Sequence, residues 1–119
     1  MMATWDLEET KHHIFICNGS SCMKKGGEEV TQAIRDTIAE HKLDRVIHTT
    51  RTRCNGRCEN ACVTILYPEG TWFKDVTPEI GKKIITEYII KENKNINEVL
   101  YTYEDHFKLQ PGNSEGKKK

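Results

Sequence analysis

The sequence has no long hydrophobic run. Nowhere does it approach the roughly 20 consecutive apolar residues that a membrane-spanning helix needs. Its first residues, MMATWDLEETKHH, also contain no apolar core of a secretory signal peptide. We therefore expect a cytoplasmic protein with no membrane partner.

An excess of charge of one sign is also missing. Lysine plus arginine and aspartate plus glutamate number 18 each, so the formal net charge is zero. No global field would draw the chain onto nucleic acid, and we expect no nucleic-acid partner.

The sequence also contains no glycine-rich phosphate loop, nucleophile elbow or paired-histidine metal motif. Hydrolase or transferase chemistry has little support, and we expect a protein that is not itself an enzyme.

The residues that are present suit one compact domain. The chain has 119 residues, of which 36% are hydrophobic and 30% are charged. This length matches a single domain, and this balance allows a modest core under a solvated surface.

Hydrophobic periodicity predicts a βαβ unit at the start. The segment HHIFIC, residues 12–17, is β-branched and aromatic and stops at the turn-forming Asn18-Gly19-Ser20-Ser21, which is typical of a buried strand. Residues 27–41 place Val30, Ile34 and Ile38 on one face of an amphipathic helix. Residues 46–50 then predict a second strand, parallel to the first.

The middle of the chain predicts a hairpin and a second helix. Residues 62–67 and 71–74 flank Pro68-Glu69-Gly70, a turn signature. Thr77 and Pro78 then suit the start of an apolar-faced helix that continues to about residue 91. The order β-α-β-β-β-α predicts a mixed sheet in an α/β (α+β) sandwich of thioredoxin type.

The two ends differ in composition from this core. We expect an N-terminal extension at 1–10, the domain at 11–93, a C-terminal arm or short helix at 94–109 and a disordered tail at 110–119. The arm would pack on the core, or alternatively dock on a second subunit or a redox partner. The short helix would be lined by Ile96, Val99, Leu100, Tyr103 and Phe107.

Four of the five cysteines form two closely spaced pairs. Cys17 and Cys22 are separated by four residues, and Cys54 and Cys58 by three. Both pairs follow predicted parallel strands, whose ends meet at one edge of a sheet, so one shared metal centre is reasonable. In a reducing cytosol, a metal or redox role is favoured over a disulfide framework.

Soft thiolate ligands suit either zinc or an iron-sulfur cluster. Zinc knuckles usually use Cys-x-x-Cys turns, whereas these wider gaps fit the span of a two-iron rhomb. The gaps match neither the plant-type nor the bacterial two-cluster ferredoxin pattern. A structural zinc module that binds another protein remains an alternative, and so does a thiol-based redox protein, although Cys-x-x-Cys is missing.

Three segments, HIFICNGSSC, TTRTRCNGRC and VTILYPEGTWFKDVTPE, together resemble the thioredoxin-like 2Fe-2S ferredoxins. They are also similar to the small 2Fe-2S flavoprotein-partner subunit of NADH dehydrogenases. The resemblance covers about residues 11–91. It implies a thioredoxin-like fold, one 2Fe-2S cluster per chain on Cys17, Cys22, Cys54 and Cys58, electron transfer with redox partner proteins, and a homodimer as an open alternative.

The remaining residues near these cysteines have more than one interpretation. Shortly after the second cysteine pair, where relatives often have Gly-Pro, this chain has Ala61-Cys62. Cys62 could be a buried structural cysteine, a substitute ligand or a resolving thiol. We favour the buried structural cysteine, because free cysteine is among the most buried residue types. His12 and His13 are interpreted as non-ligands. The basic side chains around the ligands either raise the reduction potential and dock an acidic partner, or only solvate the loops: Lys24, Lys25, Arg51, Arg53 and Arg57.

Overall fold

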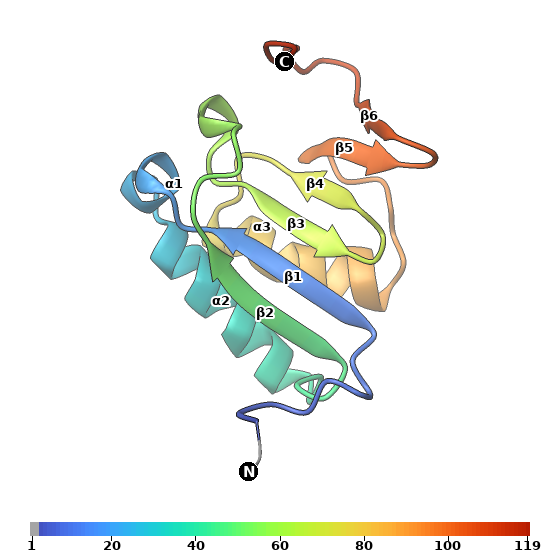
Figure 1. The fold of residues 1–119 in the computed structure, drawn as a ribbon. Helices are drawn as coiled ribbons and strands as arrows, with labels where there is room; N and C mark the ends of the chain where they lie inside the picture. The colour runs from blue at the N-terminus through green and yellow to red at the C-terminus, as the bar shows by residue number, and fades with distance from the viewer. Residues whose placement is uncertain (1–2) are drawn as a thin grey trace.

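The computed structural model describes residues 3–119. One six-stranded sheet, in the order β2-β1-β3-β4-β5-β6, forms its centre (Figure 1). In chain order the elements are β1 (His12–Cys17), α1 (Ser20–Lys24), α2 (Gly27–Glu40), β2 (Ile47–Thr52), a 3-10 turn (Cys58–Asn60), β3 (Thr64–Tyr67), β4 (Thr71–Phe73), α3 (Pro78–Lys83), its π-helical continuation (Ile84–Ile90), β5 (Val99–Tyr103) and β6 (Phe107–Leu109). Within the described residues, no helix has both the length and the apolar character needed to span a bilayer.

The predicted βαβ opening is confirmed. β1 and β2 pair in parallel, with Cys17 opposite Thr52 at the end where both strands finish. β1 also pairs antiparallel with β3, and β3 pairs antiparallel with β4, so the sheet is mixed as predicted. This arrangement brings the two cysteine-bearing loops to one edge.

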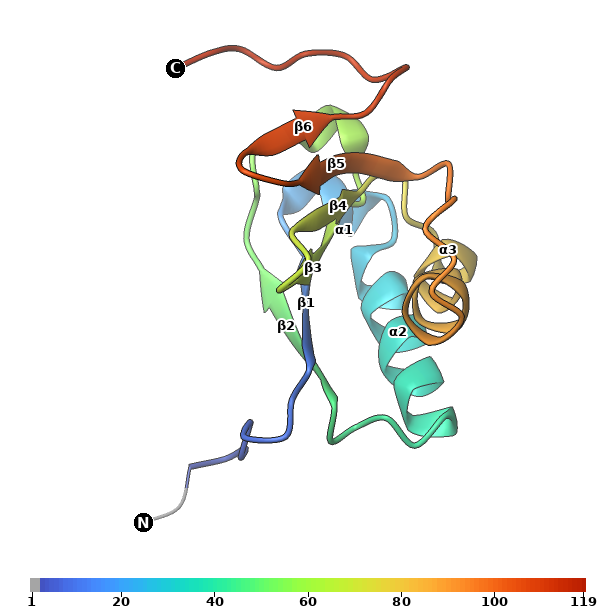
Figure 2. The same cartoon turned by 90° about the vertical axis from the view of Figure 1, so that its right-hand side faces the viewer.

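The core lies between the sheet and its helices. α2 and α3 cover one face of the sheet (Figure 2). Ile14, Leu66 and Phe73 point from the strands into this layer and have no exposed surface, and Ile34 and Ile84 of the helical layer are equally buried. Burying these side chains stabilises the fold by about 1.5–3 kcal/mol each in transfer free energy.

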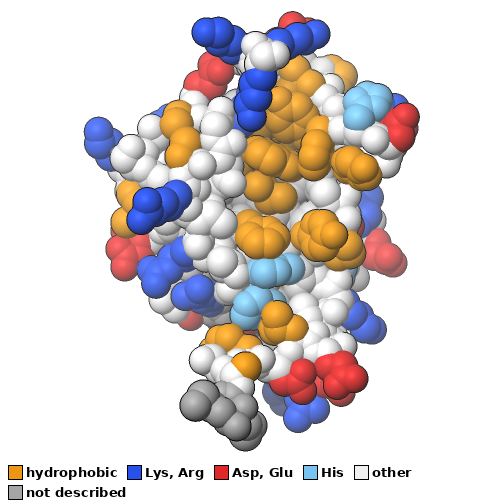
Figure 3. Space-filling model, in the orientation of Figure 1, with side chains coloured by type: hydrophobic (Ala, Val, Ile, Leu, Met, Phe, Trp, Pro, Cys, Tyr) orange, Lys and Arg blue, Asp and Glu red, His pale blue; other side chains and the backbone are white. Residues whose placement is uncertain are grey.

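The opposite face of the sheet carries an apolar row that no described helix covers. Because side chains alternate along a strand, the neighbours of the core residues point outward. The strand registers align Phe15, Ile65, Trp72, Tyr101 and Leu109 across five strands, and each is partly exposed. Figure 3 shows hydrophobic side chains gathered in a strip on this face.

The predicted second helix begins as expected. The Thr77 hydroxyl accepts a hydrogen bond from the Ile80 N–H at 3.2 Å, which caps the first turn, and Pro78 occupies the first helical position. The α-helical part ends at Lys83 and continues as the π-helical segment. The apolar face expected up to residue 91 is therefore built by two kinds of helix.

The prediction of a short helix within residues 94–109 is wrong. The segment forms strands β5 and β6, which extend the sheet beyond β4. Its apolar spacing also fits a strand, because Leu100 is buried while Tyr101 is partly exposed. The first two residues of the predicted N-terminal extension lie outside the described residues. The predicted domain boundaries stay a prediction.

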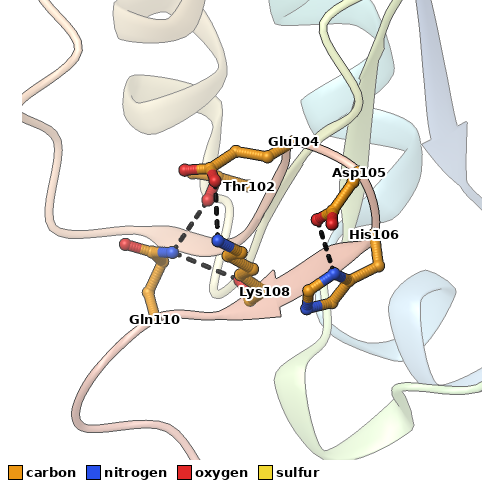
Figure 4. A network of polar contacts seen from close by, with 6 residues as sticks. All are labelled: Thr102, Glu104, Asp105, His106, Lys108 and Gln110. Carbon is orange, nitrogen blue, oxygen red and sulfur yellow. Dashed lines mark hydrogen bonds and ion pairs between the residues drawn. The ribbon is translucent and has the colours of Figure 1, made fainter.

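Polar contacts hold the β5–β6 hairpin together (Figure 4). The Lys108 ammonium lies 2.6 Å from a Glu104 carboxylate oxygen, and the Gln110 amide donates to the Thr102 hydroxyl at 2.9 Å. The Gln110 backbone N–H also donates to the Leu100 carbonyl at 2.9 Å. The start of the segment predicted to be a disordered tail is thus hydrogen-bonded to the sheet.

Candidate metal centre

The two cysteine-bearing loops follow the adjacent ends of β1 and β2. Cys17 is the last residue of β1, and Cys22 lies in the short helix α1 that follows it. Cys54 lies two residues beyond β2, and Cys58 begins the 3-10 turn. The Asn18 N–H donates to the Thr52 carbonyl at 2.8 Å and so continues the parallel pairing into the loops.

The loops touch through backbone atoms. A Cβ atom on Gly19 would lie 2.9 Å from both the Cα and the N of Cys54, which is closer than side chains tolerate. Glycine is therefore required at position 19 for the approach. This contact joins the first cysteine loop directly to the second.

All four predicted cysteines line one pocket. The lining residues are Cys17, Gly19, Ser21, Cys22, Cys54, Asn55, Arg57, Cys58 and Val63. Cys17 and Cys22 form the buried side, each 3% exposed, whereas Cys54 and Cys58 are exposed. The structure therefore brings together every residue predicted as a ligand.

The exposed pair lies close together. The Sγ atoms of Cys54 and Cys58 are 3.3 Å apart, and the Gly56 backbone N–H donates to Cys54 Sγ at 3.3 Å. These two hydrogen bonds lower the pKa of the Cys54 thiol, and the hydrogen bond from Gly56 has the larger effect. Cys54 therefore becomes a thiolate, the form that binds metal, more readily than an ordinary cysteine.

The buried pair has the opposite electrostatic character. Burial, with a smaller contribution from Cys17, raises the pKa of the Cys22 thiol to about 12. Cys17 Sγ donates to the Arg53 carbonyl at 3.5 Å. Two thiolates at these positions would be costly without a cation between them, because the apolar surroundings do not solvate charge. A metal centre bound there would supply that positive charge.

The donor set fits an iron-sulfur cluster. Four sulfurs without nitrogen or carboxylate ligands suit zinc or iron-sulfur centres. Among residues 3–119, no three or more Cys, His, Asp or Glu side chains gather tightly enough to hold one metal ion. A two-iron rhomb spans a wider set of sulfurs than a single ion does, which agrees with four cysteines spread around one pocket.

Cys62 is buried, as favoured from the sequence. It is 1% exposed and is not among the pocket-lining residues. Its thiol donates to the Cys22 carbonyl at 3.2 Å and to the Lys25 carbonyl at 3.5 Å, and burial raises its pKa. These contacts describe a side chain that supports the loop around Cys22.

The five basic residues near the four cysteines are not equivalent. Arg57 is buried at 8% exposure, whereas the other four are exposed: Lys24, Lys25, Arg51 and Arg53. His12 and His13 begin β1, at the opposite end from Cys17.

Sequence reasoning missed two features of the site. Helix α1 was not predicted, because its five residues are too few to show helical periodicity. The Arg57 guanidinium donates a hydrogen bond to the Ser114 carbonyl at 2.8 Å. The two residues are 57 positions apart in the sequence, so no local sequence pattern predicts this contact.

The sequence matches the family model of the thioredoxin-like 2Fe-2S ferredoxins over residues 6–89. Since the match covers more than half of the chain, the protein belongs to this family of small iron-sulfur electron carriers, and its cofactor is a 2Fe-2S cluster. The resemblance identified from the three sequence segments, the thioredoxin-like fold and the cofactor are thereby confirmed.

Individual proteins agree with this assignment. A putative 2Fe-2S ferredoxin of Priestia megaterium is 49% identical over 114 residues, covering 96% of this chain and 89% of that protein. The structure of a thioredoxin-like 2Fe-2S ferredoxin from Aquifex aeolicus superposes with a TM-score of 0.71 at 24% identity, covering 80% of this chain and 94% of the other. One NADH-quinone oxidoreductase subunit of Rhizobium meliloti is 25% identical over 83 residues, which cover 66% of this chain and 30% of that protein.

Proposed function

We propose that Cys17, Cys22, Cys54 and Cys58 hold the single 2Fe-2S cluster and that the chain carries one electron at a time between redox partner proteins. The observation that supports this ligand set is that four thiols from two distant loops line one pocket. When bound, the cluster supplies a site that takes up and releases a single electron without forming or breaking a bond in a substrate.

The protein's own residues divide this task. Cys17 and Cys22 anchor the buried side of the site, where water is excluded, while Cys54 and Cys58 lie at the surface. An electron would therefore enter and leave on the side of Cys54 and Cys58. The Gly56 N–H, which donates to Cys54 Sγ, favours the more negative, reduced form because it stabilises charge on sulfur.

Association of two chains into a homodimer is part of the proposal. The apolar row on the uncovered sheet face supports it, together with Tyr103 and Phe107, which are 49% and 50% exposed. Exposed patches of this kind mark protein contacts. Light scattering across a concentration series tests it, because a monomer mass at every concentration would refute the dimer.

A cytoplasmic location is likewise proposed, since free thiols persist in a reducing compartment.

The test of function is anaerobic purification followed by an absorption spectrum, iron and sulfide analysis, and reduction with dithionite. The proposal expects a red-brown protein with two irons and two acid-labile sulfides per chain, and a reversible one-electron EPR signal. A colourless protein with one zinc per chain would support the zinc-binding module instead. A metal-free protein in which a cysteine pair cycles between dithiol and disulfide would support the thiol-based alternative.

A further inference from the structure

Arg57 stands out because it is a buried cation inside the second ligand loop. It lies between Cys54 and Cys58 in the sequence, lines the same pocket as the four cysteines, and is 8% exposed. Arginine is rarely buried to this degree unless it is paired with an opposite charge. Arg53, four residues earlier, is exposed and offers a direct comparison.

The guanidinium is held in place by neutral groups. Its Nε donates to Asn60 Oδ1 at 2.9 Å, and one terminal nitrogen donates to the Ser114 carbonyl at 2.8 Å. Its central carbon lies 5.5 Å from the centre of the Tyr101 ring, within the range of a cation–π contact. Among residues 3–119, no carboxylate forms an ion pair with Arg57.

This arrangement leaves a positive charge without a counter-ion. Burying a charge is costly unless an opposite charge compensates it, and neutral acceptors and an aromatic ring compensate only part of the cost. The pocket beside Arg57 is the place where four thiolates would gather. A cluster with four thiolate ligands is net negative, so the occupant of the pocket would provide the missing counter-charge.

We infer that Arg57 is the residue through which this chain sets the reduction potential of its cluster, an inference that rests on the proposed ligand set. One electron passes from a reduced partner protein to the cluster, and no bond forms or breaks. The added negative charge is stabilised by the fixed guanidinium, which raises the potential. Asn60 and Ser114 act as positioning residues, because they fix the guanidinium of a residue that lines the pocket.

The test compares Arg57→Gln, Arg57→Lys and Arg53→Gln in the full-length holoprotein by anaerobic redox titration followed by absorption and EPR. Arg57→Gln should lower the equilibrium constant for reduction about tenfold, which converts to about 59 mV for one electron. Arg57→Lys should lower this equilibrium constant less, because lysine keeps the positive charge although it lacks the planar guanidinium group. Arg53→Gln removes the same formal charge from an exposed site and should change the potential least, because water and salt screen it.

A shift in Arg57→Gln no larger than that in Arg53→Gln would overturn the inference. If Arg57→Gln does not fold, the potential of the unmodified protein in increasing salt decides the question. Between about 0.1 M and 1 M salt the screening length falls from about 10 Å to about 3 Å. The added salt therefore screens the charge of exposed cations but screens a buried cation much less. A nearly constant potential supports Arg57, whereas a steep fall assigns the effect to the exposed lysines and arginines.

The two proposals fail in different ways. If the unmodified protein shows no iron-sulfur spectrum, or if any of the four cysteines proves dispensable for it, the proposed ligand set fails. If the spectrum is intact and the Arg57→Gln potential is unchanged, only the role of Arg57 fails.

Discussion

A Cβ atom on Gly19 would lie 2.9 Å from the backbone N and Cα of Cys54. Neither backbone atom can rotate away as the end of a long side chain would. The distance between the two cysteine loops is therefore set by the absence of a side chain at position 19.

Replacing Gly19 by alanine should push the loops apart. We expect a loss of about 1–3 kcal/mol in the free energy of unfolding, as for overpacked interiors, and a lower cluster content per chain. Urea unfolding and iron analysis measure these two effects. Ser20→Ala is the matched control, since Ser20 is the exposed next residue. Equal iron content and stability in both variants would show that the close approach is unimportant.

Cys62 should contribute to stability without holding the cluster. Cys62→Ala removes a buried thiol and its hydrogen bond to the Cys22 carbonyl, which keeps the Lys25 N–H as a second donor at 3.1 Å, so the variant should lose about 0.5–1.5 kcal/mol. Cys62→Ser retains a donor and should cost less. Denaturant unfolding of the holoprotein distinguishes the two variants. If alanine is tolerated as well as serine, the hydrogen bond to the Cys22 carbonyl does not support the loop.

His13 should make the fold less stable in mild acid. Burial, and secondarily the charge of His48, lowers the pKa of His13 below its ordinary value of 6.5. The folded state then binds protons less readily than the unfolded state. The contribution of His13 is therefore fully present above about pH 6.5 and is lost as the pH falls toward its folded pKa.

An NMR titration of the His13 imidazole measures the pKa, and unfolding at several pH values measures its consequence. His13→Gln should reduce the loss of stability between about pH 6.5 and pH 5. A His13 that titrates above 6.5 would reverse the sign of this prediction.

Local patterns were sufficient to predict the centre of the fold. The segment HHIFIC is a short run rich in β-branched and aromatic residues, the helix from Gly27 repeats apolar residues about every four positions, and Pro68-Glu69-Gly70 marks the hairpin turn. The parallel order of β1 and β2 then follows from general rules of chain connection. For this reason the meeting of the two cysteine loops at one edge of the sheet could be anticipated.

The C-terminal hairpin could not be predicted in the same way. The spacing of the apolar residues from Ile96 to Phe107 fits a helix. The segment forms strands instead because β5 pairs with the edge of β4, where Trp72 lies opposite Tyr101. The burial of Arg57 depends equally on distant partners, since Ser114 and Tyr101 approach it only in the folded chain. Sequence alone grouped Arg57 with four exposed basic residues.

The ligand set is tested most directly by changing each of the five cysteines to serine in turn, with anaerobic absorption spectra and iron and sulfide counts for every variant. We expect Cys62→Ser to keep the spectrum and two irons per chain. Serine at position 17, 22, 54 or 58 should remove the cluster or alter its spectrum. An unchanged spectrum and full iron content in any of those four variants, or loss of the cluster in Cys62→Ser, would contradict the proposed site.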